Sequence, residues 1–299
     1  MFQIVIILAL LGGLFLPNDL VLLAPFATIF LQVIFFLTSL KIDFKKVLKE
    51  IDDVYELVVP VVAILLVFPT VVYLVSSVVA PSLAVGLLLL AAMPIGMTAP
   101  LLVEVLGGKV GMALVLTVIT SLLAPFSIPF VVGFFASTAV TVSAGGMFVS
   151  LAKVILVPFV LAQIIRHFWN KKIKFLYPKF KPTSIVLLGL LIAGVVARQS
   201  ETILDGIGTT IGYQLVVLTV FIAVSLFIGY FLVFWESCED RVTVSACFTF
   251  MNFTLAIYLA GEFFVDPAIL LATVLVIFPW SLILFPYRWL IRRFVCKIG

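Results

Sequence analysis

The stretch MPIGMTAPLLVE, residues 93–104, decides how this chain folds. It lies in a long apolar segment, yet Pro94, Gly96 and Pro100 interrupt it. Proline removes a backbone donor and clashes with the preceding turn, so a helix through this stretch should kink or unwind. In hydrocarbon, the freed backbone groups need partners, which a cavity with water, ions or a solute can supply. We therefore expect a broken membrane helix with a polar site at the break.

The composition of the chain places it in the membrane. Of its 299 residues, 65% are hydrophobic and 11% are charged, whereas roughly a quarter of the residues of a soluble domain are charged. A spanning helix needs roughly 20 apolar residues, so about ten spans with short connections occupy nearly the whole length. We expect an all-α membrane protein in which residues 1–299 form one polytopic domain, without a separate soluble domain.

The apolar runs and the basic residues together predict the topology. Spans are expected near residues 3–17, 20–40, 54–77, 81–106, 110–136, 143–167, 184–199, 211–235, 243–262 and 267–294. If they alternate across the bilayer, 16 of the 18 Lys and Arg residues lie on one side, which the positive-inside rule assigns to the cytoplasm. Both termini are then cytoplasmic in a multi-pass protein of the cell membrane. The net charge of +4 reflects this topology and does not indicate nucleic-acid binding.

A weak internal repeat relates the two halves of the chain. A shift of 154 positions pairs several identical residues, among them Met97 with Met251, Leu101 with Leu255, Gly107 with Gly261 and Pro125 with Pro279. The matched segments are the fourth and fifth spans and the ninth and tenth, so repeat one covers about 1–136 and repeat two about 143–295. Five spans per repeat, an odd number, give the repeats opposite orientations in the membrane.

Polar residues occur at the matched depth in both repeats. The second repeat carries CFTFMNFTLA, residues 247–256, and the shift pairs Thr98 with Asn252. The candidate substrate site comprises Thr98, Pro100, Asn252 and Thr254. The alternative is that the polar side chains bond to their own or neighbouring helices and stabilise packing by about 0.6 kcal/mol each. Their coincidence across the repeat favours the site.

Two charged residues lie within the expected spans. Lys153 lies in the sixth span, where a charge costs about 2.5–3.5 kcal/mol unless it snorkels or faces a cavity. We expect its ammonium to face the cavity and attract an anionic group of the solute, with a snorkelling side chain as the alternative. Glu104, six residues after Thr98, is either a proton carrier or an interfacial residue at the cytoplasmic end of the fourth span.

Signatures of common enzymes are missing from the sequence. The single histidine, His167, excludes a histidine-rich metal site, and the sequence contains no phosphate-binding loop or dinucleotide fingerprint. We expect no enzymatic activity and no cofactor; the expected partners are a small-molecule solute and membrane lipids. A membrane-embedded enzyme built from Ser and Asp or Lys, or a sensor, is the alternative from another class.

Four stretches carry a resemblance to a known family: LALLGGLFLP (8–17), VIFFLTSLKIDFKKVLKE (33–50), MPIGMTAPLLVEVLGGKVGMALVLTVITSLLAP (93–125) and TFMNFTLAIYLAG (249–261). They resemble the bile acid:sodium symporters, or BASS transporters. The resemblance implies two inverted five-span repeats, with the fourth and ninth spans broken and crossing in a core domain. The first, second, sixth and seventh spans would form a panel.

The same resemblance implies a secondary transporter that moves a small organic anion by alternating access between panel and core. Auxin-efflux-type carriers share the architecture and are the alternative family. The identity of the solute, the direction of transport and the oligomeric state stay open.

The sodium ligands of the family carry over only in part. The fifth-span threonine and the ninth-span asparagine are retained, as Thr117 and Asn252. The other aligned positions have no side-chain carboxylate or amide: Ile64, Ala99, Pro100, Cys247 and Met251. A dehydrated sodium ion needs about five or six oxygen ligands. We therefore expect transport that is independent of sodium, driven by the solute gradient or by protons with Glu104 as the carrier. Backbone carbonyls and Thr117 could still form one weak sodium site.

Overall fold

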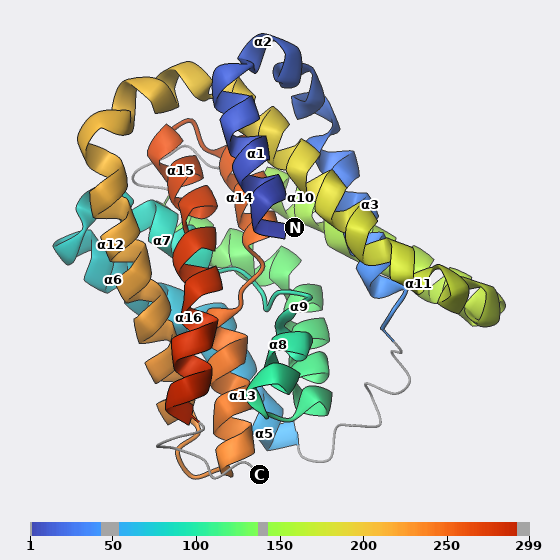
Figure 1. Cartoon of the computed structure of the whole chain (residues 1–299). Helices are drawn as coiled ribbons and strands as arrows, with labels where there is room; N and C mark the ends of the chain where they lie inside the picture. The colour runs from blue at the N-terminus through green and yellow to red at the C-terminus, as the bar shows by residue number, and fades with distance from the viewer. Residues whose placement is uncertain (1, 43–53, 137–142, 292–299) are drawn as a thin grey trace.

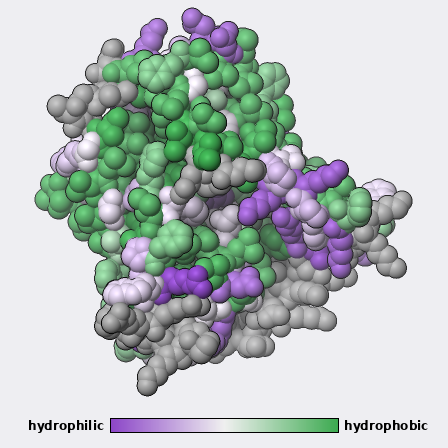
Figure 2. Space-filling view, in the orientation of Figure 1, coloured by the Kyte–Doolittle hydropathy of each residue, from purple (hydrophilic) through white to green (hydrophobic). Residues whose placement is uncertain are grey.

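The computed structural model describes residues 2–42, 54–136 and 143–291 and shows a helical protein (Figure 1). Within these ranges every regular element is a helix, and the only extended pairing is an isolated bridge between Ile95 and Met251. Figure 2 shows one face of the molecule, which is largely hydrophobic. Large apolar side chains such as Val78, Phe130 and Phe134 are exposed. Such a surface fits contact with lipid. The predicted all-α membrane fold is confirmed.

Seven helical segments are long and apolar enough to cross a bilayer. They are Pro17–Ser39, Leu57–Val79, Val110–Ala136, Ala144–Trp169, Ile173–Arg198, Ile211–Leu232 and Pro267–Leu290. Three further apolar helices are shorter: Ile4–Phe15, Pro81–Ala91 and Phe253–Phe263. Two of these three end or begin at a break, and a broken span consists of pieces too short to cross alone. By length, the described residues thus show seven spans where the sequence predicts ten. The expected span 184–199 corresponds to the second part of the longer segment Ile173–Arg198.

The N-terminal helices pack along one long helix. α1 (Phe2–Phe15), η1 (Val21–Phe26) and α3 (Ala27–Ser39) all contact α11 (Val157–Arg198), and α2 (Pro17–Leu20) connects α1 to η1. Pro17 occupies the first turn of α2, where a missing N–H leaves no hydrogen bond unmade. These elements form one side of the molecule in Figure 1.

Two π-helical turns lie within otherwise α-helical segments. η2 (Ala63–Val67) joins α5 (Val54–Val62) to α6 (Phe68–Val79), and η4 (Ala152–Leu156) joins α10 (Ala144–Leu151) to α11. A proline follows each turn closely, at Pro69 and Pro158. Because a proline cannot donate to the carbonyl four residues before it and its ring clashes there, a wider turn accommodates the ring.

The remaining elements complete the helical body. They are η3 (Pro81–Leu83), α7 (Ala84–Ala91), α8 (Ala99–Leu106), α9 (Val110–Ala136), α12 (Ser200–Leu232), α13 (Cys238–Thr249), α14 (Phe253–Phe263), α15 (Pro267–Leu275) and α16 (Ile277–Leu290). Helix α8 ends at Gly107, whose φ of 84° lies in the left-handed region that a glycine adopts without strain.

Two of these helix pairs, α7 with α8 and α13 with α14, are each interrupted by a non-helical break, and the two breaks lie against each other. The chain is not helical between α7 and α8, as Pro94 and Gly96 predict, and Pro100 lies in the first turn of α8 rather than in the break. The second break, between α13 and α14, contains no proline. The two breaks pair with each other: the Gly96 N–H donates to the Phe250 carbonyl, and the Asn252 N–H donates to the Pro94 carbonyl, both at 2.8 Å. Part of the freed backbone is therefore satisfied by the other break and not by a cavity.

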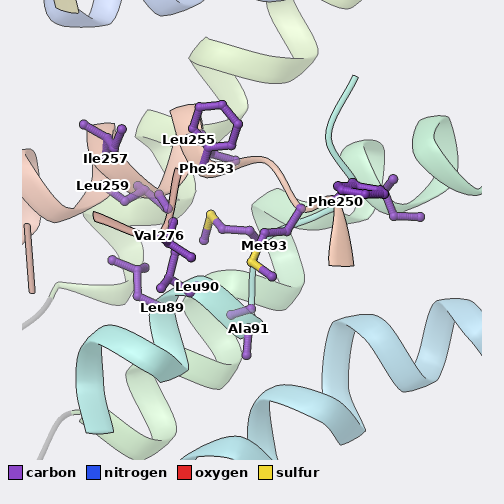
Figure 3. Close-up of a cluster of buried hydrophobic side chains, with 14 of the residues drawn as sticks. Leu89, Leu90, Ala91, Met93, Phe250, Phe253, Leu255, Ile257, Leu259 and Val276 are labelled. Carbon is purple, nitrogen blue, oxygen red and sulfur yellow. The ribbon is translucent and has the colours of Figure 1, made fainter. Parts of the chain in front are cut away.

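The crossing is embedded in apolar side chains. Figure 3 shows buried residues from both broken spans gathered around it, including Met93, Phe250 and Phe253. One more backbone donor is satisfied here, since the Ile95 N–H donates to the Thr120 hydroxyl of α9 at 3.3 Å. Away from water, an unpaired backbone group costs several kcal/mol, roughly, so these bonds hold the two breaks in one arrangement.

Close backbone approach at the crossing requires a glycine. A Cβ atom on Gly96 would lie 2.8 Å from the Phe250 carbonyl oxygen and 3.0 Å from the Met251 carbonyl oxygen. We expect Gly96→Ala to lower the free energy of unfolding by about 2 kcal/mol or more. The added Cβ forces the two breaks apart, and a buried hydrogen bond between them is lost. Thermal unfolding of the purified protein in detergent measures this change. Gly145→Ala is the control, since nothing lies within 4 Å of a Cβ there; equal melting temperatures of the two variants would contradict the prediction.

Candidate functional site

The two breaks place polar residues at the start of the second half-helices. Thr98 is the N-cap of α8, and Asn252 is the N-cap of α14. The two positions are separated by the same shift of 154 that relates the halves of the sequence. Thr98 is exposed, Asn252 is 8% exposed, and Thr254 lies in the first turn of α14. The structure therefore brings these candidate residues to one crossing.

Several polar groups at the crossing have no hydrogen-bond partner among the described residues. The Asn252 Oδ1 accepts a hydrogen bond from the Leu255 N–H at 3.2 Å and so caps α14. Within the described residues, no hydrogen bond involves the Asn252 Nδ2, the Thr98 hydroxyl or the Thr254 hydroxyl. Asn252 therefore agrees with the packing alternative, because its Oδ1 bonds to its own helix. The hydroxyls of Thr98 and Thr254 make no such bond within the described residues. The groups are available to a solute, and that role remains a prediction.

A small cavity with two further hydroxyls lies beside the first break. Its volume is about 10 Å³, and it is lined by Phe35, Ser39, Ile42, Met97, Val118, Ser121, Leu122, Ile155 and Phe159. The Ser39 and Ser121 hydroxyls are buried and have no hydrogen-bond partner among the described residues. A cavity of this size suits about one water molecule. Neither serine was a predicted site residue, although both lie in stretches that carry the family resemblance.

The positions aligned with the family's sodium ligands are packed inside the protein. Ile64, Ala99, Cys247 and Met251 belong to the main buried apolar cluster. Thr117 is also buried, and its hydroxyl donates to the Ala113 carbonyl at 2.7 Å. Among the described residues, no group of three or more His, Cys, Asp or Glu side chains could hold a metal ion.

The two charged candidates lie away from this buried region. Lys153 is exposed in η4 on a helix face shared with exposed Val149 and Val157, and no described contact joins its side chain to the breaks. Its surroundings are those of a snorkelling lysine on an apolar face. Glu104 is exposed in the last turn of α8, where the interfacial alternative places it.

Hydroxyl groups join α14 to the N-terminal side of the molecule. The Tyr258 hydroxyl, on α14, lies 2.7 Å from the Ser150 hydroxyl of α10 and 3.2 Å from the Thr28 hydroxyl of α3. Tyr258 is 2% exposed. We call these three residues the Tyr258 relay. The relay was not predicted from the sequence, because its members lie far apart in the chain.

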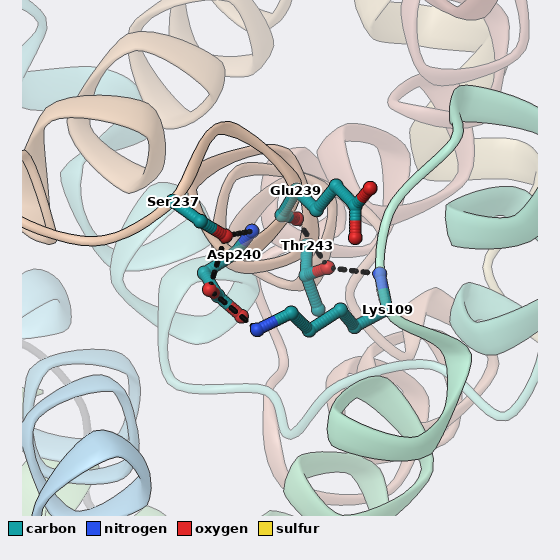
Figure 4. Close-up of polar contacts among 5 residues, drawn as sticks. All are labelled: Lys109, Ser237, Glu239, Asp240 and Thr243. Atoms are coloured by element: carbon teal, nitrogen blue, oxygen red, sulfur yellow. Dashed lines mark hydrogen bonds and ion pairs between the residues drawn. The ribbon is translucent and has the colours of Figure 1, made fainter. Parts of the chain in front are cut away.

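A second polar cluster joins the C-terminal end of α8 to the N-terminal end of α13 (Figure 4). The Lys109 ammonium lies 2.7 Å from the Asp240 Oδ2, and the Lys109 N–H donates to the Thr243 hydroxyl at 2.7 Å. The Ser237 hydroxyl donates to the same Asp240 oxygen. Asp240 lies in the first turn of α13, where a carboxylate also interacts favourably with the helix dipole. The broken spans are thus joined both at their breaks and at this end.

Comparisons with known proteins agree with the resemblance in the sequence. The model of the Sodium Bile acid symporter family matches residues 28–206. The "Uncharacterized sodium-dependent transporter YocS" of Bacillus subtilis is 27% identical over 206 residues, which cover 67% of this chain and 63% of that protein. The "Probable sodium/metabolite cotransporter BASS1, chloroplastic" of Arabidopsis thaliana is 23% identical over 190 residues, 62% of this chain and 46% of that protein. The matches thus span less than two thirds of these relatives.

The hydrogen bonds at the crossing predict how alanine substitutions change stability. Asn252→Ala should lower the free energy of unfolding by about 1 kcal/mol, because it removes the cap of α14. Thr98→Ala and Thr254→Ala should change it by less than about 0.5 kcal/mol, because their hydroxyls bond to no described group. Thermal unfolding in detergent distinguishes the cases. A loss at either threonine as large as at Asn252 would favour the packing alternative.

Proposed function

Because this chain belongs to the sodium bile acid symporter family, we propose that it is a secondary transporter of a small organic anion that works by alternating access. The family match favours this function over an auxin-efflux-type carrier. The observation that carries the proposal is the set of unpaired polar groups where two broken helices cross. Irregular backbone at membrane depth is tolerated where it is buried in protein or lines a cavity, and in transporters it forms the substrate site.

The proposed architecture has ten spans in two inverted repeats. The first repeat comprises α1, α2 with α3, α5 with α6, α7 with α8, and α9. The second comprises α10 with the first part of α11, the second part of α11, α12, α13 with α14, and α15 with α16. One observation supports this division: α8 and α14 start at N-caps that are 154 positions apart, which is the shift that relates the two halves of the sequence. Both termini are then cytoplasmic.

The proposed substrate class is an anion because donors surround the crossing. The N-termini of α8 and α14 begin at Thr98 and Asn252, and a helix N-terminus carries partial positive charge. The hydroxyls of Thr98 and Thr254 and the Nδ2 of Asn252 can donate to a carboxylate or a similar group. Pro100 contributes shape here, since it has no donor. Lys153 stays outside the proposed site because it lies on an exposed apolar face.

The Tyr258 relay and the small cavity are consistent with a movement in which α3 and α11 shift relative to the crossing. The relay connects α14 to α3 and α10 in the outward half of the proposed topology. The cavity, with Ser39 and Ser121, separates α3 and α11 from α9 and the first break in the inward half. In alternating access, the hydrogen bonds of the relay would break in the outward-open state, and the cavity would enlarge in the inward-open state.

For the coupling, we propose transport without sodium. The relatives are named sodium-dependent and sodium/metabolite cotransporters, but the aligned ligand positions of this chain are filled by Ile64, Ala99, Pro100, Cys247 and Met251. A hard cation needs oxygen ligands at these positions. The buried side chains there present apolar or sulfur atoms instead. The solute gradient alone or protons would drive transport, with Glu104 as the candidate proton carrier.

Uptake into proteoliposomes tests the function. Labelled organic carboxylates and sulfonates are compared with their neutral amides, and at least one anion should accumulate in a saturable way. For that anion, Thr98→Ala or Thr254→Ala should lower the rate by about tenfold or more, because each removes a donor that interacts with a charged group. Gly145→Ala is the control. Absence of flux for every anion while a ligand still binds would favour a sensor or an enzyme, and unchanged rates in both threonine variants would exclude this site.

Replacement of sodium by choline at fixed pH tests the coupling. We expect the uptake rate of the identified anion to change by less than about twofold, because no carboxylate or amide occupies the five aligned positions. A saturable sodium dependence with a fall of tenfold or more would contradict this prediction and would assign sodium binding to Thr117 and backbone carbonyls. If an inward proton gradient raises uptake, Glu104→Gln should abolish that increase.

A further inference from the structure

The bend of α11 forms a separate projection of the molecule. Residues 166–182, here called the α11 elbow, comprise the end of the segment Ala144–Trp169, the junction after it and the start of the segment Ile173–Arg198. Within the elbow, Trp169 has the non-helical angles φ −125° and ψ 26°. In Figure 1 the elbow lies at the right-hand edge of the molecule, and the end of α3 lies against it. In the proposed topology it lies on the cytoplasmic side.

The elbow is held in place and does not hang freely. It shares a small buried apolar cluster with the end of α3, formed by Leu40, Ala162, Ile173 and Phe180. The Tyr177 hydroxyl donates to the Leu40 carbonyl at 3.0 Å, and the Gln163 Nε2 donates to the Ser39 carbonyl at 3.1 Å. These contacts fix the direction in which the outer residues of the elbow point.

Outward from this cluster, the elbow presents large apolar side chains next to lysines. Phe168, Trp169 and Phe175 are 69%, 53% and 83% exposed. Lys174 and Lys179 are exposed beside them in the sequence. Aromatic rings and lysines in this combination are typical of the boundary between lipid tails and headgroups, where the rings enter the interface and the ammonium groups remain in the polar layer.

The positive charge of the α11 elbow is not balanced by acidic residues near it in the sequence. The elbow contains five lysines, and the chain has no Asp or Glu between Glu104 and Glu201. Partial burial of Lys41, and secondly the nearby charge of Lys181, lower the pKa of Lys41. Within the described residues, no ion pair involves Lys174, Lys179 or Lys181. A cluster of exposed like charges attracts an external anion.

We propose that the α11 elbow binds anionic phospholipid headgroups of the cytoplasmic leaflet. The lysines contact the phosphates, and Phe168, Trp169 and Phe175 insert between the headgroups. The rings decide for a lipid over a soluble anion, because a dissolved phosphate gives an exposed phenylalanine nothing to contact. A charged membrane surface attracts each nearby lysine, and several together give a stable preference for anionic lipid.

The full chain in proteoliposomes tests this proposal without a transport assay, so the result does not depend on the proposed function. The probes are phosphatidylglycerol and phosphatidylcholine brominated near the headgroup, and the signal is the quenching of Trp169, obtained by subtracting a Trp169→Phe variant from the wild type. We expect phosphatidylglycerol to compete for the elbow at least about fivefold better than phosphatidylcholine. The preference should decrease as salt rises, because salt screens exposed charges.

Two matched triple variants separate charge from fold. Lys174→Gln with Lys179→Gln and Lys181→Gln should reduce the preference to about twofold or less, whereas the three corresponding Lys→Arg changes should retain it. Equal quenching by both lipids in the wild type, or a preference that survives in the Gln variant, would overturn the proposal and leave the lysines a role in topology alone. Protection of these lysines from acetylation by polyglutamate but not by phosphatidylglycerol would also overturn it, in favour of an acidic protein partner.

Discussion

The backbone pairing between the two breaks is the constraint on which the rest of the structure depends. Two spans can be interrupted in the middle of a bilayer only if the exposed N–H and C=O groups find partners. Here Gly96 and Phe250, and Asn252 and Pro94, provide those partners for each other. The pairing needs a glycine at position 96, apolar packing that keeps water out, and two helices that start again directly after the crossing.

The polar groups of the candidate site are a consequence of that restart. A helix that begins inside the membrane needs partners for the N–H groups of its first turn. In α8 the N–H groups of Ala99, Leu101 and Leu102 donate to the carbonyls of Gly96 and Thr98. Asn252 supplies a cap for α14, whereas the Thr98 side chain makes no capping bond for α8. At the other end of α8 and α13, Lys109 and Asp240 join the two helices again. The two half-helices are therefore connected at both ends and should move as one body, with the site at the end where they cross.

The sequence predicted the first break and most of the apolar spans because these depend on local features. Pro94 and Gly96 cannot continue a helix, whatever surrounds them. The second break contains no proline and was expected only through the repeat. That the breaks pair with each other was not predicted, because the pairing joins segments about 150 positions apart. For the same reason, the sequence did not predict a role for Ser39, Ser121 or the Tyr258 relay. A serine or a tyrosine in an apolar span does not indicate which residue of another helix it contacts. Lys153 was placed by its depth alone, and depth does not tell which face of a helix a residue occupies.

The Tyr258 relay has a consequence for how this protein can diverge. The tyrosine ring is buried among apolar side chains, and only its hydroxyl bonds to Ser150 and Thr28. Exchanges of Tyr for Phe or of Ser for Ala alter a single oxygen and leave the shape of the packed surface nearly unchanged. The strength of the contact between α14 and its neighbours can thus be adjusted in small steps, one hydroxyl at a time, without repacking the helices. Related chains could differ in how long they dwell in one conformation while sharing the same fold and the same crossing.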